Sequence, residues 1–369
     1  MLGPGTGYVI TMDVTLPQPL HRTFGRFLMQ NETNRLFYEW LETDGLGGFA
    51  TGTVGGIRTR RYHNLLMYAT QPPAGRIVLV NGLEVWVETP SGQTALSTQR
   101  YSPDVVHPDG QSRLVSFAYD LWPTWTYQLN DGLISHELFV PQGRSETVLR
   151  WSVHGCASCT LKVRPLLSGR DYHSLQRENG TFNFEAKLRN GCVQWRPYSG
   201  MPGISADHNG KYTYAPEWYR QFQYDDERAR GLDCIEDLAS PGVLSFDLSL
   251  GDAVLVLRAV PKGVQIGPLD SALDYARQLR EAERSRREAF ASPLERAADA
   301  NIVRRGTGRT IVAGYPWFTD WGRDTFIALR GLCLATGRFE LAAEILLEWA
   351  GAISEGMLPN RFPDFGESL

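Results

Sequence analysis

The sequence contains few cysteines, and their positions do not suggest a disulfide framework. The five are Cys156, Cys159, Cys192, Cys234 and Cys333. An odd number at irregular spacing is typical of reduced thiols. Cys156 and Cys159 have the spacing of a metal-ligand pair, but no second Cys or His pair with similar spacing accompanies them. We therefore expect neither a disulfide nor a metal site.

Long apolar runs and an excess of positive charge are also missing. No stretch approaches the ~18 consecutive apolar residues needed to cross a membrane, so no membrane partner is expected. Residues 1–7 lack the basic region and apolar core of a signal peptide, which favours a cytoplasmic location. The 37 lysines and arginines are outnumbered by 41 aspartates and glutamates, giving a net charge of -4. This balance argues against nucleic acid as the main partner.

The chain does contain enough apolar and aromatic residues for more than one domain. Hydrophobic residues make up 42% of the sequence, and a length of 369 residues suggests two domains. The 10 tryptophans and 15 tyrosines suit a carbohydrate-binding surface, although the core of a β-sandwich also uses such residues.

Residues 31–265 are predicted to form a large antiparallel β-sandwich after an N-terminal extension at 1–30. Short runs with strand patterns recur at 76–80, 83–88, 147–151, 161–164 and 253–258. Turn signals that contain Asn-Gly or Asp-Gly separate or flank these runs at 81–82, 130–132 and 209–210. Many strands at short spacing imply two packed sheets.

Helical patterns replace the strands after residue 265. The linker 266–293 is predicted to contain a helix at 269–291, where Arg and Glu interleave around a thin apolar stripe. We expect this helix to be solvated and to lie on a neighbouring element without binding a polyanion. Further helices are predicted at 294–304, 325–336 and 338–354, and the last two stop at Gly337 and Gly356.

The segment before the helix at 325–336 has the composition of a sugar-recognition turn. Residues 315–326, YPWFTDWGRDTF, combine two tryptophans, an arginine and two aspartates. Aromatic faces stack on sugar rings, and Arg and carboxylate groups form directed hydrogen bonds with hydroxyls. In the structural alternative, Asp324 only caps the helix and both tryptophans belong to the core. Asp320 and Asp364 are weaker candidates, which turns or helix caps explain equally well.

A glycine-rich run lies near the N-terminus. Residues 39–49, EWLETDGLGGF, include Gly45, Gly47 and Gly48, which permit positive φ angles and close backbone approach. No strand–turn–helix unit surrounds them, so we do not expect a dinucleotide loop.

These motifs resemble those of glycogen debranching enzymes. The run WGRDTFIALRG at 321–331 is similar to the start of their glucosidase domain, and LPNRFPD at 358–364 fits the same family. Residues 34–66 resemble their N-terminal domain, although Asp44 and Asn64 stand where Asn and Gly are expected. The resemblance implies that residues 294–369 begin an (α/α)6 barrel. Only its first helices fit before Leu369, so we expect the chain to be truncated.

The resemblance also implies a function, the hydrolysis of α-1,6 branch points by an inverting amylo-alpha-1,6-glucosidase. Its substrates would be glycogen, limit dextrin or branched maltooligosaccharides, and it would need no cofactor. By analogy with glucoamylases, Arg323 and Asp324 would bind hydroxyls of the terminal glucose. We expect Trp317, Trp321, Asn360 and Arg361 to bind the substrate beside them.

Such an enzyme also needs a general acid and a general base. The family carries both in later loops of the barrel, so the resemblance implies that they lie beyond Leu369. This chain alone is therefore expected to be inactive. In the alternative assignment, Asp324 is the acid.

Other interpretations remain open. The chain is alternatively a non-catalytic carbohydrate-binding or regulatory fragment, or a glucoamylase-like hydrolase of another α-glucoside. Residues 60–63, RRYH, either contact the barrel or a glucan, or form an internal hydrogen-bond network, which we favour. A few barrel helices would expose apolar faces, and we expect these faces to promote association unless they dock on the sandwich.

Overall fold

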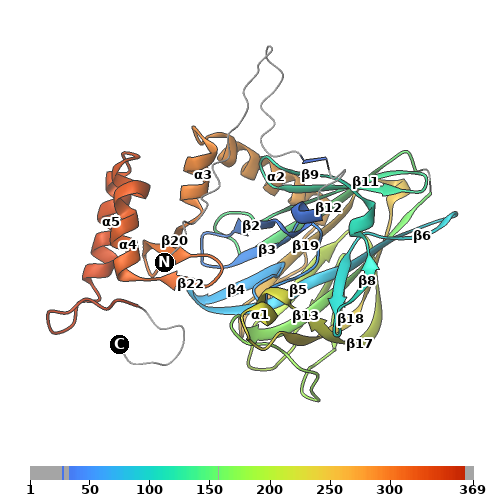
Figure 1. Ribbon diagram of the computed structural model, residues 1–369, viewed down its shortest axis with the longest axis horizontal. Helices are drawn as coiled ribbons and strands as arrows, with labels where there is room; N and C mark the ends of the chain where they lie inside the picture. The colour runs from blue at the N-terminus through green and yellow to red at the C-terminus, as the bar shows by residue number, and fades with distance from the viewer. Residues whose placement is uncertain (1–26, 29–32, 157, 362–369) are drawn as a thin grey trace, which may run out of the picture.

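The computed structural model describes residues 27–28, 33–156 and 158–361. It shows two large antiparallel sheets packed against each other, followed by a smaller unit of strands and helices (Figure 1). The predicted sandwich followed by helices is confirmed. Continuation of the helices into an (α/α)6 barrel remains a prediction.

Within the described residues, the two sheets contain nine and eight strands. The first has the order β1 (Phe27–Leu28), β9 (Leu114–Tyr119), β10 (Pro123–Leu129), β11 (Gly132–Phe139), β12 (Glu146–His154), β19 (Ala253–Val260), β16 (Gly203–His208), β15 (Cys192–Trp195) and β14 (Ala186–Arg189). The second has the order β4 (Leu66–Gln71), β5 (Ala74–Thr89), β13 (Thr160–Asp171), β18 (Ile235–Asp247), β17 (Lys211–Gln223), β7 (Thr98–Tyr101) and β8 (Val105–Asp109), with β6 (Gly92–Ala95) paired to β5.

Shorter elements complete the N-terminal part. The strands β2 (Glu39–Thr43) and β3 (Phe49–Thr53) form a separate hairpin. Single helical turns occur at η1 (Thr33–Phe37), η2 (Gln111–Arg113), α1 (Asp225–Ala229) and η3 (Leu248–Leu250).

Aromatic residues fill much of the space between the two sheets. The His136 ring stacks between Trp125, at 5.2 Å between ring centroids, and Trp151, at 4.6 Å. Burial lowers the pKa of His136 to about 4, so this imidazole is neutral at physiological pH and behaves as a core aromatic group. Most of the tryptophans are therefore buried in hydrophobic clusters. Trp40, Trp125, Trp151 and Trp195 lie in the main core, while Trp122 packs with the linker helix and Trp349 packs in the C-terminal unit.

One predicted turn is wrong. Asn81 and Gly82 lie inside the continuous strand β5, whereas the turns at 130–132 and 209–210 do join strands as predicted. The Asn81 side chain donates a hydrogen bond to the buried carboxylate of Glu236 at 3.4 Å. A Cβ atom on Gly82 would clash with Nη1 of Arg58. These residues therefore accommodate buried polar groups, a role that local turn preference does not reveal.

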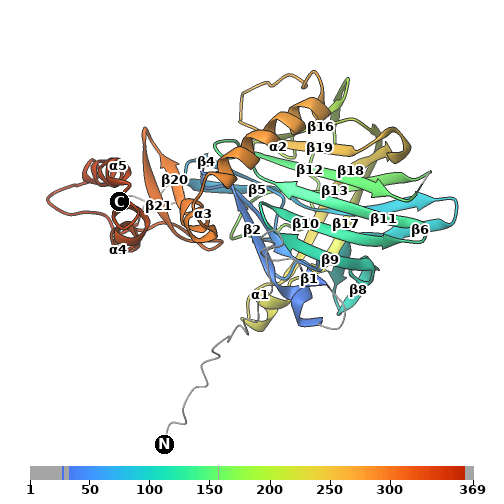
Figure 2. The ribbon, with the colours of Figure 1, turned by 90° about the horizontal axis from the view of Figure 1, so that it is seen from above.

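The linker helix α2 (Ala272–Glu288) lies across β19 and β16 of the first sheet (Figure 2). Ser271 caps its N-terminus by accepting a hydrogen bond from the Asp274 amide at 3.2 Å. Ala276 and Leu279 pack against the outer side of the sheet, as the thin apolar stripe predicted. The expectation of a solvated charged face is only partly met, because Glu283 and Arg287 are buried as well.

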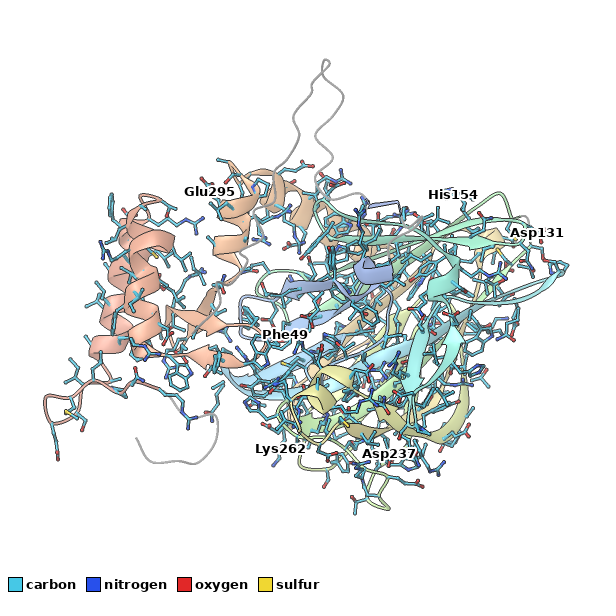
Figure 3. All side chains as sticks on the ribbon, in the orientation of Figure 1. Phe49, Asp131, His154, Asp237, Lys262 and Glu295 are labelled. Atoms are coloured by element: carbon cyan, nitrogen blue, oxygen red, sulfur yellow. The ribbon has the colours of Figure 1, made fainter. Side chains whose placement is uncertain are left out.

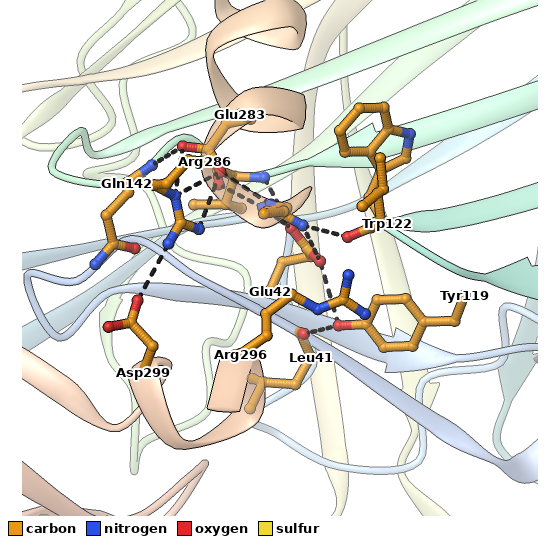
Figure 4. A network of polar contacts seen from close by, with 12 residues as sticks. Leu41, Glu42, Tyr119, Trp122, Gln142, Glu283, Arg286, Arg296 and Asp299 are labelled. Carbon is orange, nitrogen blue, oxygen red and sulfur yellow. Dashed lines mark hydrogen bonds and ion pairs between the residues drawn. The ribbon is translucent and has the colours of Figure 1, made fainter. Parts of the chain in front are cut away.

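A network of charges fastens α2 to the sandwich (Figure 4). The Arg287 guanidinium donates to both carboxylate oxygens of Glu42, at 3.0 and 2.7 Å, and to Glu283 at 2.9 Å. It also donates to the carbonyl oxygens of Leu121 and Val140. Each buried charge thus has several partners, which offset the cost of removing it from water.

The C-terminal unit differs from the prediction at its start. The helix expected at 294–304 ends early, since α3 (Pro293–Asp299) is followed by β20 (Ile302–Arg305). That strand belongs to a three-stranded sheet with β21 (Gly308–Gly314) and β22 (Phe318–Asp320). Ile302 and Val303 are buried in it, and such β-branched residues fit a strand as readily as a helix face.

Two helices follow the small sheet. α4 (Gly322–Leu329) begins three residues earlier than predicted and continues as the π-helical turn η4 (Arg330–Leu334), and α5 (Phe339–Ala350) comes next. Gly337 has a φ of 72°, as expected of a helix stop. Their outer faces expose Ile327 by 68%, Phe339 by 63% and Leu347 by 73%. The predicted exposure of apolar faces is confirmed, and the resulting association remains a prediction.

The buried charge network generates a stability prediction. Arg287→Met is expected to lower the free energy of unfolding by about 3–5 kcal/mol, because it leaves Glu42 and Glu283 buried without their cation. Urea unfolding of the variant and the parent chain measures the difference. Arg277→Met is the matched control, since Arg277 lies on the same helix with its side chain 67% exposed. We expect the control to change stability by less than about 1 kcal/mol; equal effects would contradict the role assigned to the network.

Candidate functional site

The aromatic turn at 315–321 lies against one edge of the sandwich. Phe49, labelled in Figure 3, faces this turn, and its ring centroid is 5.4 Å from that of Tyr315. The hydroxyl of Tyr172 donates a hydrogen bond to the carbonyl oxygen of Trp317 at 3.2 Å. Tyr315 and Trp317 pack with the buried side chains of Phe49, Tyr62 and Tyr172. The sandwich therefore holds the backbone and the aromatic rings of the turn.

Arg76 on β5 is the central residue of this contact. Its side chain is fully buried, and its guanidinium lies 5.6 Å from the ring centroid of Phe49, 5.3 Å from Tyr172 and 5.5 Å from Tyr315. It also donates a hydrogen bond to the carbonyl oxygen of Phe318 at 3.1 Å. Sequence reasoning missed this residue; the available signal was a single arginine at the start of the apolar run 76–80.

The N-terminal glycine loop supports the same region. Gly45 and Gly47 have φ angles of 69° and 101°, and a Cβ atom on Gly47 would lie 2.5 Å from the carbonyl oxygen of Pro73. Gly48 has no positive φ, but it allows the close approach of the Asp44 carboxylate. The amide of Arg304 donates to the carbonyl oxygen of Gly45 at 2.9 Å, so this loop also contacts β20.

Asp44 is a buried carboxyl group in this loop. Burial raises its pKa to about 7, and this effect outweighs the backbone hydrogen bonds from Leu46 and Gly48 and the charge of Arg76, all of which lower it. Its Oδ1 atom accepts the Leu46 amide at 2.7 Å. The group therefore carries a proton over much of the acidic pH range.

Within residues 60–63, Arg61 and His63 form the internal network that the sequence analysis favoured. The Arg61 guanidinium donates to the carbonyl oxygens of His173, at 2.6 Å, and Asp233, at 2.8 Å. Burial lowers the pKa of His63, and its Nδ1 accepts the Thr59 amide at 3.1 Å. The neutral ring therefore carries its proton on Nε2 and donates it to Glu39 at 2.8 Å.

Arg60 and Tyr62 point in a different direction from Arg61 and His63. The Arg60 guanidinium lies 5.4 Å from the ring centroid of Trp317, and the Tyr62 ring centroid lies 6.5 Å from it. These two residues thus face the predicted sugar-recognition turn, while Arg61 and His63 face the sandwich.

The structure brings together the predicted site residues on either side of α4 and α5. The amide of Gly322 donates to the carbonyl oxygen of Asn360 at 2.8 Å, and the Arg323 amide donates to Oδ1 of Asn360 at 3.3 Å. Trp321 and Arg361 form an isolated β-bridge, and the Arg361 guanidinium lies 5.9 Å from the Trp321 ring centroid. Five of the six predicted binding residues, Trp321, Arg323, Asp324, Asn360 and Arg361, therefore lie within one small region.

Trp317 occupies a separate position beside the sandwich. Phe318, which the sequence analysis did not single out, connects the two groups because its ring centroid is 6.0 Å from that of Trp321. Phe318 is 48% exposed, so this connection is open to solvent.

The carboxylates near the turn have different surroundings. Asp324 lies in the first turn of α4 with its side chain 37% exposed, and it accepts a hydrogen bond from Nη2 of Arg323 at 3.4 Å. It does not cap the helix, whose N-cap is Trp321. Asp320 is fully buried and pairs with Arg305 at 2.7 Å, and burial raises its pKa. Asp320 is therefore a structural residue.

The C-terminal end of the predicted site lies outside the described residues. Asp364 falls in this part of the chain, and so does Leu369, beyond which the general acid and base are expected. The placement of the acid and base beyond Leu369 and the truncation of the chain there therefore stay predictions. Among the residues proposed for catalysis, the structure describes only the fallback candidate, Asp324.

Metal-binding and membrane-spanning features are absent from the described part of the chain. Within residues 27–28, 33–156 and 158–361, no three His, Cys, Asp or Glu side chains are grouped to hold a metal ion. All five cysteines are free thiols. Among the described helices, none is long and apolar enough to span a membrane.

Two known protein families match this chain, one at each end. Residues 296–369 match the family described as "Amylo-alpha-1,6-glucosidase", which is a class of glycoside hydrolase. Residues 38–255, more than half of the chain, match the family described as "Glycogen debranching enzyme N terminal". The chain belongs to the glycogen debranching enzyme family.

Individual relatives match over limited lengths. The glycogen debranching enzyme of Saccharomyces cerevisiae is 43% identical over 56 residues, which cover 14% of this chain and 4% of the yeast protein. A bacterial glucoamylase solved with acarbose superposes with a TM-score of 0.47 at 12% identity, covering 92% of this chain and 51% of that one. Heparinase III superposes with a TM-score of 0.26 at 14% identity, covering 41% and 21% of the two chains. The chain thus spans about half of the glucoamylase and a small part of the yeast protein.

The Arg76 contact generates a testable prediction. Arg76→Met is expected to speed amide hydrogen exchange in residues 315–321 at least about tenfold, because a hydrogen bond from a charged donor to the Phe318 carbonyl is lost. Exchange measured by mass spectrometry at peptide resolution tests it. Arg164→Met is the matched control, because Arg164, on the neighbouring strand β13, also stacks on two aromatic rings, those of Trp86 and Tyr219, but pairs with Glu84 and not with the turn. Unchanged exchange at 315–321 in Arg76→Met would refute the prediction.

Asp44 generates a prediction about pH. The native carboxyl keeps its proton up to about pH 7, whereas the unfolded chain releases it near its ordinary pKa of 3.8. Between these values the unfolded state binds fewer protons, so this group makes the native state less stable as the pH rises. Asp44→Asn removes the titration, so its advantage in Tm over the parent chain should grow between pH 4 and pH 7 and then level off. A Tm difference that shrinks over this range would contradict the assignment.

Proposed function

We propose that this chain contributes the glucose-binding part of an enzyme that removes α-1,6-linked branches from glycogen, limit dextrin or branched maltooligosaccharides. Membership of the debranching family supports the substrate class. The reaction would be an inverting hydrolysis, which needs water, a general acid and a general base but no metal.

The observation that carries the proposal is the meeting of residues 321–324 with residues 360–361. Two hydrogen bonds, one to the backbone and one to the side chain of Asn360, fix the first turn of α4, and Trp321 and Arg361 lie side by side next to it. An indole face, a guanidinium and a carboxylate are then grouped together. This combination suits a sugar, whose C–H face stacks on aromatic rings and whose hydroxyls donate to carboxylates and accept from guanidinium groups.

Asp324 is assigned to binding and not to proton transfer. Its carboxylate pairs with Arg323 at the N-terminus of a helix, where negative charge is favourable. A carboxylate in this setting is well suited to accept hydrogen bonds from hydroxyls, whereas a general acid must carry a proton. The acid and the base of the reaction are accordingly assigned to other parts of the enzyme, beyond Leu369.

Glucose binding tests this proposal. Arg323→Met is expected to raise the Kd for glucose about tenfold or more, since a charge-assisted hydrogen bond contributes roughly 1.5–3 kcal/mol. Titration calorimetry with the purified chain measures it. Arg309→Met is the matched control, because Arg309 is an exposed arginine on β21 of the same unit. Equal affinity in the parent chain and Arg323→Met would remove the basis of the binding assignment.

Glucose release from limit dextrin separates binding from catalysis. Binding without release is the expected result for the 369-residue chain. Release that Asp324→Asn abolishes, with glucose affinity unchanged, would make Asp324 the general acid and contradict the role given above. If the debranching activity of the longer enzyme did not depend on this glucose binding, that result would instead favour a regulatory or carbohydrate-binding fragment.

A further inference from the structure

An open hollow lies next to the glucose-binding region, on the side of the sandwich. It has a volume of about 590 Å³ and is lined by Arg60, Tyr62, His173, Arg230, Trp317 and Phe318. Four of these residues come from the sandwich part of the chain and two from the turn at 315–321. The hollow therefore forms only where the two parts meet.

One residue, Phe318, connects the hollow to the region of Trp321. Phe318 lines the hollow and also packs edge-on against Trp321, with 6.0 Å between the ring centroids. Trp321 in turn precedes Arg323 and Asp324, so the hollow lies on the side of Phe318 away from the residues proposed to bind glucose.

Its side chains are held in place before any ligand binds. The Tyr62 hydroxyl and Nδ1 of His173 are 3.0 Å apart, and their rings meet at right angles. Arg60 stacks on Trp317 while its Nε donates to Glu39 at 2.7 Å. Preorganised side chains lose little conformational freedom on binding, which favours affinity.

The charge of the lining favours a neutral, hydroxyl-rich ligand. Among the described residues, no carboxylate lines the hollow, and both of its arginines already have acidic partners nearby: Arg60 has Glu39 and Asp226, and Arg230 has Glu227 at 3.7 Å. A guanidinium has five N–H donors, more than these pairs use, so donors remain for sugar hydroxyls. The aromatic rings supply apolar surface for the sugar faces.

We propose that this hollow binds the two or three glucose units next to the terminal one, so that the sandwich takes part in recognising the length of an α-glucan. The inference rests on the proposed function, because it assumes that Trp321, Arg323 and Asp324 bind the end of the same chain. It assigns a ligand-binding role to Tyr62, His173 and Arg230, which lie far apart along the sequence yet share one surface.

Paired titrations with glucose and maltoheptaose test the inference. Phe318→Ala and Arg230→Ala are each expected to weaken maltoheptaose binding about tenfold, the order expected when a stacked ring or a charged donor is lost. The Kd for glucose should change less than about twofold. Tyr214→Ala, at an aromatic residue of β17 that is 55% exposed, is the control and should change neither affinity.

The possible outcomes distinguish this inference from the proposed function. Unchanged maltoheptaose affinity in both variants, together with weaker glucose binding in Arg323→Met, would overturn the binding role of the hollow and leave the proposed function intact. Absence of both affinities in the parent chain would overturn both. Thermal unfolding of each variant checks that it is folded, and His173→Ala provides a third variant at an exposed lining residue. If the parent chain forms a dimer that Phe318→Ala dissociates but maltoheptaose leaves intact, a second copy of the chain covers the hollow. That result would also overturn the inference.

Discussion

The position of the candidate site depends on a buried guanidinium that is stacked on aromatic rings. Arg76 is fully buried, and removing such a group from water is costly unless its surroundings compensate. Three ring faces and the carbonyl oxygens of Pro73 and Phe318 contribute to that compensation. One of the rings, Tyr315, belongs to the C-terminal turn itself. The turn and the sandwich core are therefore stabilised by the same residue.

A second contact between the parts has a different chemistry. Arg287 on α2 reaches Glu42 on the β2–β3 hairpin and Glu283 on its own helix, so this contact consists of ion pairs and backbone acceptors. An ion pair specifies geometry through directed hydrogen bonds, while an aromatic cage specifies it through shape. The Arg287 contact holds the linker helix and the Arg76 contact holds the turn. The C-terminal unit is therefore attached to the sandwich at two separate places.

The sequence predicted those elements whose patterns are local. Strand alternation, the helix stop at Gly337 and the positive φ of Gly45 and Gly47 follow from the preferences of single residues or short runs, and the structure confirms them. The strand at 302–305 was mistaken for helix, because a short apolar run has no period long enough to separate the two. The Asn81-Gly82 pair was mistaken for a turn, because the groups that it accommodates, the Glu236 carboxylate and the Arg58 guanidinium, belong to other parts of the sequence.

The candidate site shows the same division between local and distant determinants. The motif at 321–324 supplies functional groups that can be recognised from residue types, but their arrangement depends on a contact with residues 359–361. Gly322 permits that contact, since a Cβ atom there would lie 3.0 Å from the carbonyl oxygen of Pro359 and 3.1 Å from the Trp349 ring. Trp349 is buried on α5 and donates to the hydroxyl of Thr310 on β21 at 3.2 Å. The arrangement of the candidate site thus depends on a core tryptophan behind it, so that packing in the C-terminal unit and the proposed sugar recognition at its surface depend on the same glycine.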